Sequence, residues 1–275
     1  MKKFINILLI LVLGLGLVAC KTEGQQADQG NETTSAIEKI QNKGTLVVGT
    51  SADYPPFEWI SHDSGSEEYV GVDIELAKKI AEELGVELEI KNMAYEGLVG
   101  SLMVDDIDLV IAGMAASPEK MEQVDFSDPY YQGGQVLLVL EENKDSYTSF
   151  ADLEGKKIGT QLGSTQQGLA SEKYGSNVFG YDLNNVLIEQ LKNKSIDVAF
   201  LSEIPAKQFA AITDGLAIVE LADLEDEDGF AVALNKNQDD LRDKISQIIK
   251  DLKDSATIQE WLDEYIELST SQAGK

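Results

Sequence analysis

The chain offers few residues for catalysis. It contains one histidine, His62, and one cysteine, Cys20. His62 lies in the polar stretch 61–68, which indicates a surface loop, so a Ser-His-Asp triad would require that loop to fold into a cleft. One cysteine cannot form an intramolecular disulfide or a zinc site with several thiolates, and one histidine excludes a paired-histidine metal site. We therefore expect no catalytic residue, no metal and no cofactor.

Motifs for phosphate and calcium are also missing. The sequence has no P-loop. The closely spaced Gly14 and Gly16 lie within residues 1–19, an N-terminal segment that we interpret below as a cleaved leader. The acidic run 225–228 fails the EF-hand pattern, because position 1 would be Leu224 and position 12 would be Asn235. We interpret this run as a solvated acidic loop.

One segment is suited to bind an anion. The residues GSTQ (163–166) open a helix predicted over 165–173. Free N–H groups and the helix dipole favour a carboxylate at such an end. The alternative is that Ser164 is only a helix cap.

The elements that would position such residues alternate between strand and helix. Short apolar or alternating runs predict strands, and apolar residues that repeat at three and four predict helices. The predicted strands are 45–50, 86–91, 107–111, 157–160 and 196–201; the predicted helices are 72–84, 97–104, one beginning at Ser117-Pro118, 165–173, 186–192 and 204–211. This alternation indicates an α/β fold with mostly parallel sheets.

The elements form two weakly similar sets. DIDLV (106–110) is echoed by SIDVA (195–199), and Gly49-Thr50 by Gly159-Thr160. Two apolar runs, 135–140 and 229–234, are suited to cross between lobes, and apolar positions from Leu241 to Tyr265 predict C-terminal helices. Two α/β lobes with two crossings would leave a ligand cleft at the carboxyl ends of the strands.

Charge and the N-terminal residues indicate where the protein acts. The net charge of −27 argues against nucleic-acid binding, which needs clustered basic residues. Residues 1–19 have a positive start and an apolar run too short to span a membrane, as a signal peptide does. They end in Leu17-Val18-Ala19-Cys20, which resembles the bacterial lipobox; that resemblance implies a lipid (palmitate-type) anchor on Cys20 and an extracytoplasmic, membrane-attached protein. Residues 20–36 read as a flexible tether.

Four motifs occur in order along the body: GTSADYPPF (49–57), GVDIELA (71–77), AGMAASPEK (112–120) and VDFSDPYY (124–131). Together they resemble the polar amino-acid substrate-binding proteins of ABC importers, over residues 46–265. The resemblance implies the two-lobed type II periplasmic-binding fold, with lobe 1 formed by 37–133 plus 229–275 and lobe 2 by 134–228. It also implies closure at hinges near 132–136 and 227–231.

The resemblance also implies a set of ligand contacts. Tyr54 and Tyr95 would be the aromatic walls around the ligand side chain, and Glu203 would pair with the ligand ammonium. Backbone groups in the segment that contains Ala112, Gly113 and Ala115 would meet the amino and carboxylate groups, with Lys120, Ser164 and Thr165 at the carboxylate and Gln161 at a polar ligand tip. Each of these residues has an ordinary structural alternative, as a core or surface tyrosine, a helix cap or an exposed acid.

Three positions depart from the family pattern. Lys120 stands where an arginine typically grips the ligand carboxylate, and lysine offers a point charge without a planar fork. Ser51 stands where an aspartate often accompanies cationic or amide ligands, which argues mildly against a cationic ligand. Ala115 replaces a common hydroxyl residue and leaves only its backbone.

The expected function is capture of a free polar L-amino acid and its delivery to the permease and ATPase of an ABC importer. One alternative is a solute receptor for a membrane sensor. Another is a cyclic-acid dehydratase on the same fold, for which Glu203 or Asp53 would be the only acid–base candidates. Which amino acid binds, with what affinity and in what oligomeric state is left open.

Overall fold

The computed structural model describes residues 35–62, 65–224 and 228–272. The leader, Cys20, most of the tether and residues 225–227 of the acidic loop lie outside the described residues. Across the part that is described, no helix is both long and apolar enough to cross a membrane.

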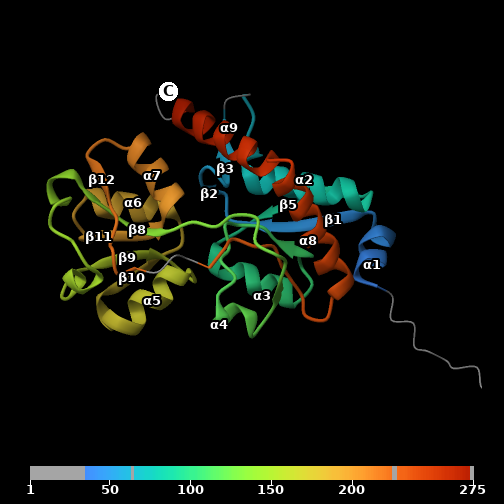
Figure 1. The fold of residues 1–275 in the computed structure, drawn as a ribbon, viewed down its shortest axis with the longest axis horizontal. Helices are drawn as coiled ribbons and strands as arrows, with labels where there is room; N and C mark the ends of the chain where they lie inside the picture. The colour runs from blue at the N-terminus through green and yellow to red at the C-terminus, as the bar shows by residue number, and fades with distance from the viewer. Residues whose placement is uncertain (1–34, 63–64, 225–227, 273–275) are drawn as a thin grey trace, which may run out of the picture. The chain divides into compact units, whose positions relative to one another are not determined.

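The first sheet has the strand order β5-β1-β6-β13-β7. Figure 1 labels its strands β1 and β5, which are neighbours. β1 (Thr45–Thr50) runs parallel to β5 (Glu87–Asn92) and β6 (Leu109–Val110), whereas β13 (Ala233–Leu234) runs antiparallel to β6 and to β7 (Asp125–Phe126). The sheet is therefore mixed, and the predicted parallel character holds for its first three strands. We call this sheet, with the elements packed on it, lobe 1.

The helices of lobe 1 follow the apolar periodicity closely. α2 occupies Val72–Leu84, as predicted, and is followed by Gly85. Gly85 has a φ of 71°, in the left-handed region, which glycine adopts without strain because it has no Cβ atom. α1 (Ala36–Lys43) begins at a Ser35–Glu38 capping box. The remaining elements are η1 (Tyr95–Gly97), α3 (Leu98–Met103), α4 (Pro118–Met121), α8 (Asp239–Asp254) and α9 (Thr257–Gln272).

A small antiparallel sheet of lobe 1 was not predicted. It consists of β2 (Asp53–Tyr54), β3 (Glu58–Ser61) and β4 (Glu68–Val70), and β3 and β4 contact α2. His62 follows β3 and is exposed, as expected for a loop residue.

The second sheet has the order β10-β9-β11-β8-β12, and we call it, with its helices, lobe 2. β9 (Ile158–Gln161) is parallel to β10 (Val178–Tyr181) and β11 (Val198–Ser202), while β8 (Gln135–Leu140) is antiparallel to β11 and to β12 (Leu216–Val219). Its other elements are η2 (Glu141–Asn143), η3 (Phe150–Leu153), α5 (Thr165–Tyr174), η4 (Gly175–Asn177), α6 (Asn184–Lys192) and α7 (Glu203–Ile212).

The weak sequence repeat corresponds to a structural repeat. A Cβ atom added to Gly49 of β1 would lie 2.4 Å from Ile107 Cδ1, and one added to Gly159 of β9 would lie 2.4 Å from Ile196 Cδ1. The two isoleucines thus cover equivalent glycines in the two sheets.

The aspartates that follow these isoleucines also match. Asp108 Oδ2 accepts from Val47 N–H at 2.7 Å, and Asp197 Oδ2 accepts from Lys157 N–H at 2.8 Å. In return, the N–H of each aspartate donates to the carbonyl of the same partner, at 2.8 Å in both lobes. The short echo between 106–110 and 195–199 therefore marks the same joint between neighbouring strands.

Of the two apolar runs expected to cross between the lobes, 135–140 is strand β8, whereas 229–234 contains both the end of a crossing and β13. The crossings themselves precede β8 and β13, which pair within the second and the first sheet. The chain segments that precede them pair with each other: Tyr130 N–H donates to Phe230 O at 2.8 Å, and Phe230 N–H donates to Tyr131 O at 2.9 Å.

The C-terminal helix contacts elements of both lobes. α9 packs on α2 and α8 of lobe 1 and on α7 of lobe 2 (Figure 1). Gln208 Nε2 donates to Thr270 Oγ1 at 2.7 Å, and Tyr265 OH donates to Glu75 Oε1 at 2.8 Å. The tail therefore packs against elements of both lobes.

Candidate functional site

Four buried chain segments follow or end strands at the carboxyl edges of the two sheets. In lobe 1, Ser51 follows β1 and the segment 112–115 follows β6; in lobe 2, Gln161 ends β9 and Ser202 ends β11. Carboxyl edges of parallel strands are where α/β sheets bind ligands. The structure therefore places Ser51, Gln161 and the 112–115 segment at the expected edges.

The two tyrosines predicted as walls are both buried in lobe 1. Tyr54 is 8% exposed and Tyr95 is 7% exposed. The Tyr54 ring lies on Gly113, where an added Cβ would sit 3.1 Å from its Cδ1 atom, and Gly113 has a φ of +50°. A glycine at this position lets the backbone adopt this conformation directly against the ring.

The backbone at Gly113 is fixed by a hydrogen bond to a buried acid. Gly113 N–H donates to Asp73 Oδ2 at 2.7 Å, and Asp73 is fully buried at the start of α2. This amide is thus engaged inside lobe 1, as is the carbonyl of Ala115, which accepts from Ser117 N–H at 2.9 Å. Asp73 belongs to the motif GVDIELA (71–77), but its role in fixing this segment was not predicted.

Asp73 forms a buried carboxyl pair with Glu58 of β3. Burial raises the pKa of Asp73 to about 6, opposed by the bond from Gly113, and burial together with the charges of Asp73 and Asp53 raises the pKa of Glu58 well above its usual value. A proton on Glu58 would let it donate to Asp73, whereas two ionised carboxylates have no donor between them. The loop that carries Gly113 therefore rests on a pair of buried acids.

Lys120 brings a cation to the same region from α4. It is buried, with 9% exposure, and its Nζ lies 6.0 Å from the centre of the Tyr95 ring. That distance is at the outer limit of a cation–π contact. The predicted carboxylate-binding cation and one predicted aromatic wall are therefore neighbours.

Lobe 2 presents the start of α5. Ser164 Oγ accepts from Gln167 N–H at 3.1 Å and donates to Gln161 O at 2.8 Å, so Ser164 caps the helix. Thr165 Oγ1 is buried and has no hydrogen-bond partner among the described residues. The cap reading of Ser164 and the anion-site reading are compatible, because the side chain caps one amide of the first turn and leaves others.

Sequence reasoning missed a row of buried polar side chains in lobe 2. Gln166 Nε2 donates to Gln135 Oε1 at 3.2 Å and lies 3.4 Å from Ser202 Oγ, and all three residues are buried. Gln135 and Ser202 are opposite each other on β8 and β11. The available signal was a polar residue at one end of each of two otherwise apolar strands, Gln135 in β8 and Ser202 in β11.

Glu203 directly follows Ser202, but its carboxylate forms an ion pair with Lys207 one turn along α7, a contact that lowers its pKa. It lines a cavity of about 420 Å³ together with Tyr131 and residues of α7 and α9. Lys120 and Ser164 line other cavities, and the pairing of Glu203 with a ligand ammonium stays a prediction.

Two cavities lie between Lys120 on one side and the start of α5 on the other. One, of about 900 Å³, is lined by Lys120, Gln135, Ser164 and Thr165 among others. The second, of about 480 Å³, is lined by Tyr95, Lys120 and Ser164 among others. Residues predicted from both lobes for the ligand carboxylate thus face common space.

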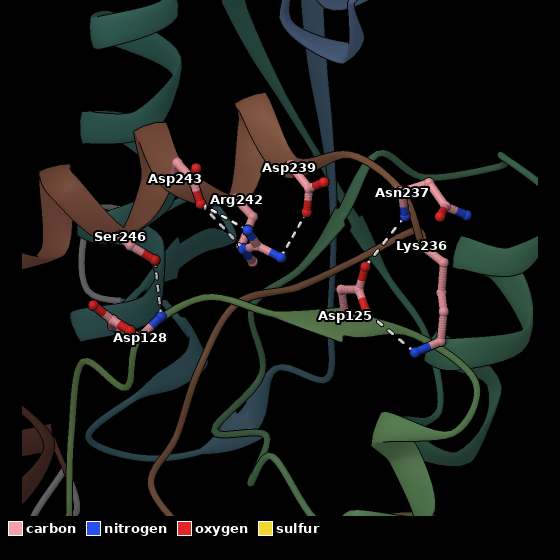
Figure 2. Close-up of polar contacts among 8 residues, drawn as sticks. All are labelled: Asp125, Asp128, Lys236, Asn237, Asp239, Arg242, Asp243 and Ser246. Atoms are coloured by element: carbon pink, nitrogen blue, oxygen red, sulfur yellow. Dashed lines mark hydrogen bonds and ion pairs between the residues drawn. The ribbon is translucent and has the colours of Figure 1, made fainter.

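The chain's only arginine is not part of this site. Arg242 of α8 pairs with Asp239 at 2.7 Å and with Asp243 at 2.9 Å (Figure 2). It borders a separate cavity of about 500 Å³, also lined by Asp125 and Asp128. No guanidinium group therefore lines the two cavities that contain Lys120.

Metal ligands are not gathered anywhere in the described ranges. No group of three or more His, Cys, Asp or Glu side chains among these residues could hold a metal ion.

Curated relatives cover nearly the whole chain. The arginine-binding extracellular protein ArtP of Bacillus subtilis is 32% identical over 94% of this chain and 96% of its own length. A probable histidine-binding protein of Campylobacter jejuni is 33% identical over 86% of this chain and 88% of its own length.

Solved structures show the same fold. An amino-acid ABC transporter substrate-binding protein of Streptococcus pneumoniae, bound to L-arginine, superposes with a TM-score of 0.82 at 35% identity, covering 85% of this chain and 99% of that one. An ancestral amino-acid-binding protein described as a precursor of cyclohexadienyl dehydratase gives a TM-score of 0.77 at 30% identity, covering 84% of this chain and 100% of that one. These two-lobed neighbours confirm the predicted architecture. Because residues 46–268 also match the model of the bacterial extracellular solute-binding proteins, family 3, the chain belongs to that family.

Proposed function

We propose that this protein binds a free polar L-amino acid outside the cytoplasmic membrane and delivers it to the permease of an ABC importer. The observation that carries the proposal is the pair of cavities that Lys120 shares with the first turn of α5. A buried cation facing helix N–H groups across a cleft is suited to hold a carboxylate. Family membership and relatives named for binding arginine and histidine support the same function.

The ligand carboxylate would lie between Lys120 and the N–H groups that follow Ser164, with Thr165 Oγ1 as a further donor. The ligand side chain would lie between Tyr54 and Tyr95. Closing the cleft removes water from both ligand charges, so each needs a partner in the protein. For the ammonium, Gln135 lines the larger of these cavities and the buried Ser202 lies opposite it on β11, whereas Glu203 lines a different cavity and is paired with Lys207.

Calorimetric titration with each of the twenty amino acids and with cystine tests the function. We expect one or a few to bind. If none binds at millimolar concentration, the proposal is wrong. Incubation of the protein with a binding amino acid should yield no product, which separates a binding protein from an enzyme on this fold.

Two variants test the carboxylate site. Lys120→Ala should weaken binding about ten- to a hundredfold, because a hydrogen bond to a charged group contributes about 1.5–3 kcal/mol. Lys207→Ala removes a partly exposed cation from a cavity outside this site and serves as the matched control. Equal affinities of Lys120→Ala and the unmodified protein would remove Lys120 from the site.

The ammonium partner is tested by a second pair. Ser202→Ala should weaken binding, whereas Glu203→Ala should change it little, because Glu203 is held by Lys207. The opposite order would restore Glu203 as the ammonium partner and would require its side chain to turn away from Lys207 on binding.

We further propose that Cys20 carries a lipid that holds the protein at the membrane after removal of residues 1–19. The support is the lipobox-like sequence and the tether that follows it. Metabolic labelling with palmitate should mark the protein, and Cys20→Ala should abolish the label and release the protein from the membrane fraction. Label retained in the variant would contradict this assignment.

The lobe limits 37–133 plus 229–275 and 134–228 are likewise our proposal, with hinges near 132–136 and 227–231. The two sheets and the paired segments at Tyr130, Tyr131 and Phe230 support them.

A further inference from the structure

The two lobes touch directly through a side chain next to a predicted aromatic wall. Asp53 precedes Tyr54 in β2 of lobe 1, and Asn184 is the first residue of α6 in lobe 2. Asp53 Oδ2 accepts from Asn184 N–H at 2.5 Å, and Asp53 Oδ1 accepts from Asn184 Nδ2 at 3.0 Å.

The contact completes a helix end that lobe 2 leaves open. The N-cap residue of α6 is Leu183, which makes no side-chain cap bond. A helix start has amide donors that need acceptors, and an acid is favoured there by the helix dipole. Asp53 supplies the acceptor from the other lobe, so α6 is capped only while the lobes are together.

The contact lies where the two lobes would move apart if the cleft opened. Asp53 lies beyond the carboxyl end of β1, and Asn184 lies beyond the carboxyl end of β10, so the contact joins the two edges that border the cleft. A second close approach lies beside the other wall, where a Cβ added to Gly163 of lobe 2 would sit 3.1 Å from Glu96 Cα. Opening the cleft would separate both pairs.

The Asn184 side chain is fully buried by this contact, and its Oδ1 has no hydrogen-bond donor among the described residues. Burial of Asp53 raises the pKa of its carboxyl to about 6, against the lowering effect of the two bonds from Asn184. The contact therefore buries a charge that open, solvated lobes would leave in water.

We propose that Asp53 and Asn184 form a latch that holds the lobes together without ligand and so sets the fraction of protein in the binding-competent, closed state. The inference rests on the proposed function only in treating the space between the lobes as the ligand site. Because apparent affinity scales with the closed fraction, loss of the latch should weaken ligand binding by about tenfold while leaving the ligand contacts intact.

The test measures the lobe separation in the ligand-free protein. Spin labels on Glu122→Cys in lobe 1 and Glu172→Cys in lobe 2, both exposed, report the distance across the cleft in the full chain in detergent, with Cys20→Ser to keep the labelling specific. We expect a population at short distance in this parent and its loss in Asn184→Ala. The matched control is Asn185→Ala, whose side chain is exposed on the same turn of α6 and which should keep the parent distribution.

Two variants of Asp53 distinguish the latch from a general packing effect. Asp53→Ala should open the lobes as Asn184→Ala does, and combining the two should add little, because both remove the same contact. Asp53→Asn should stay closed, because an amide can accept from the Asn184 amide and donate to its unpartnered Oδ1. An identical distance distribution in all variants, or a parent that is fully open without ligand, would overturn the proposal. These distances are read without ligand, so they remain decisive even if no amino acid binds.

Discussion

Replacing Glu58 by glutamine should stabilise the protein relative to the unmodified protein, and this difference should grow as the pH rises. Glu58 is 1% exposed and lies beside Asp73, and burial and neighbouring acids raise its pKa well above the usual value. The folded state therefore holds a proton on Glu58 that the unfolded chain releases, so the carboxyl favours folding at low pH and disfavours it as the pH rises. Glutamine keeps the shape, donates to Asp73 through its amide and has no proton to hold.

The magnitude follows from proton linkage. Wherever the folded protein keeps this proton and the unfolded chain has lost it, the native state loses about 1.4 kcal/mol per pH unit relative to the variant. Urea unfolding of both proteins at intervals from pH 5 to pH 8 gives the difference in the free energy of unfolding. Other titrating groups are common to both proteins and largely cancel in this difference.

Two outcomes would contradict this prediction. A difference that stays constant with pH would mean that Glu58 titrates alike in the folded and unfolded chains. A difference that moves against the variant as the pH rises would mean that the fold stabilises the ionised carboxylate, and a proton on Glu58 would be wrong. Glu68→Gln is the matched control, because it removes a carboxylate from an exposed position of β4.

Three further changes should have distinct effects on stability, each measured by urea unfolding. Gly71→Ala should destabilise the protein by several kcal/mol, because its φ is +126° and a Cβ would lie 2.1 Å from Phe57 O; normal stability would show that this turn can relax. Gly100→Ala should instead stabilise it by about 0.5–1 kcal/mol, since Gly100 is inside α3 with no atom within 4 Å of its Cβ position, and a loss would mean that α3 has a hidden neighbour. Lys250→Ala should change stability by less than about 0.5 kcal/mol, because its partner Asp254 is exposed on the same helix; a larger loss would reveal a contact beyond this pair.

The sequence predicted those elements whose limits depend on local chemistry. α2 was predicted to its exact ends, because apolar residues repeat on one face and Gly85 stops the helix. The buried strands β1 and β9 were located by their β-branched residues and their glycines. The two-residue strands β2, β7 and β13 have too few residues for a periodic pattern, and only pairing with distant partners defines them.

The motifs also predicted several site positions, including Tyr95, Lys120 and Ser164, which the structure gathers around shared cavities. Motif order could not predict where the Glu203 carboxylate points. Glu203 begins α7, and Lys207 follows four residues later, one turn along the helix. The ion pair between these two side chains forms within the helix, so it does not depend on the cleft.

By itself, the sequence determined that this is an acidic α/β protein with the motifs of one solute-binding family, with one cysteine after an apolar N-terminal segment and one histidine in a polar stretch. These properties follow from composition and from patterns within a few residues. Only the tertiary structure decided which polar groups meet: Asp53 with Asn184, Glu58 with Asp73, and Gln135 with Ser202 through Gln166. These partners come from different strands and helices, and burial makes each pairing matter, because a polar group removed from water must find its partner wherever the fold places one.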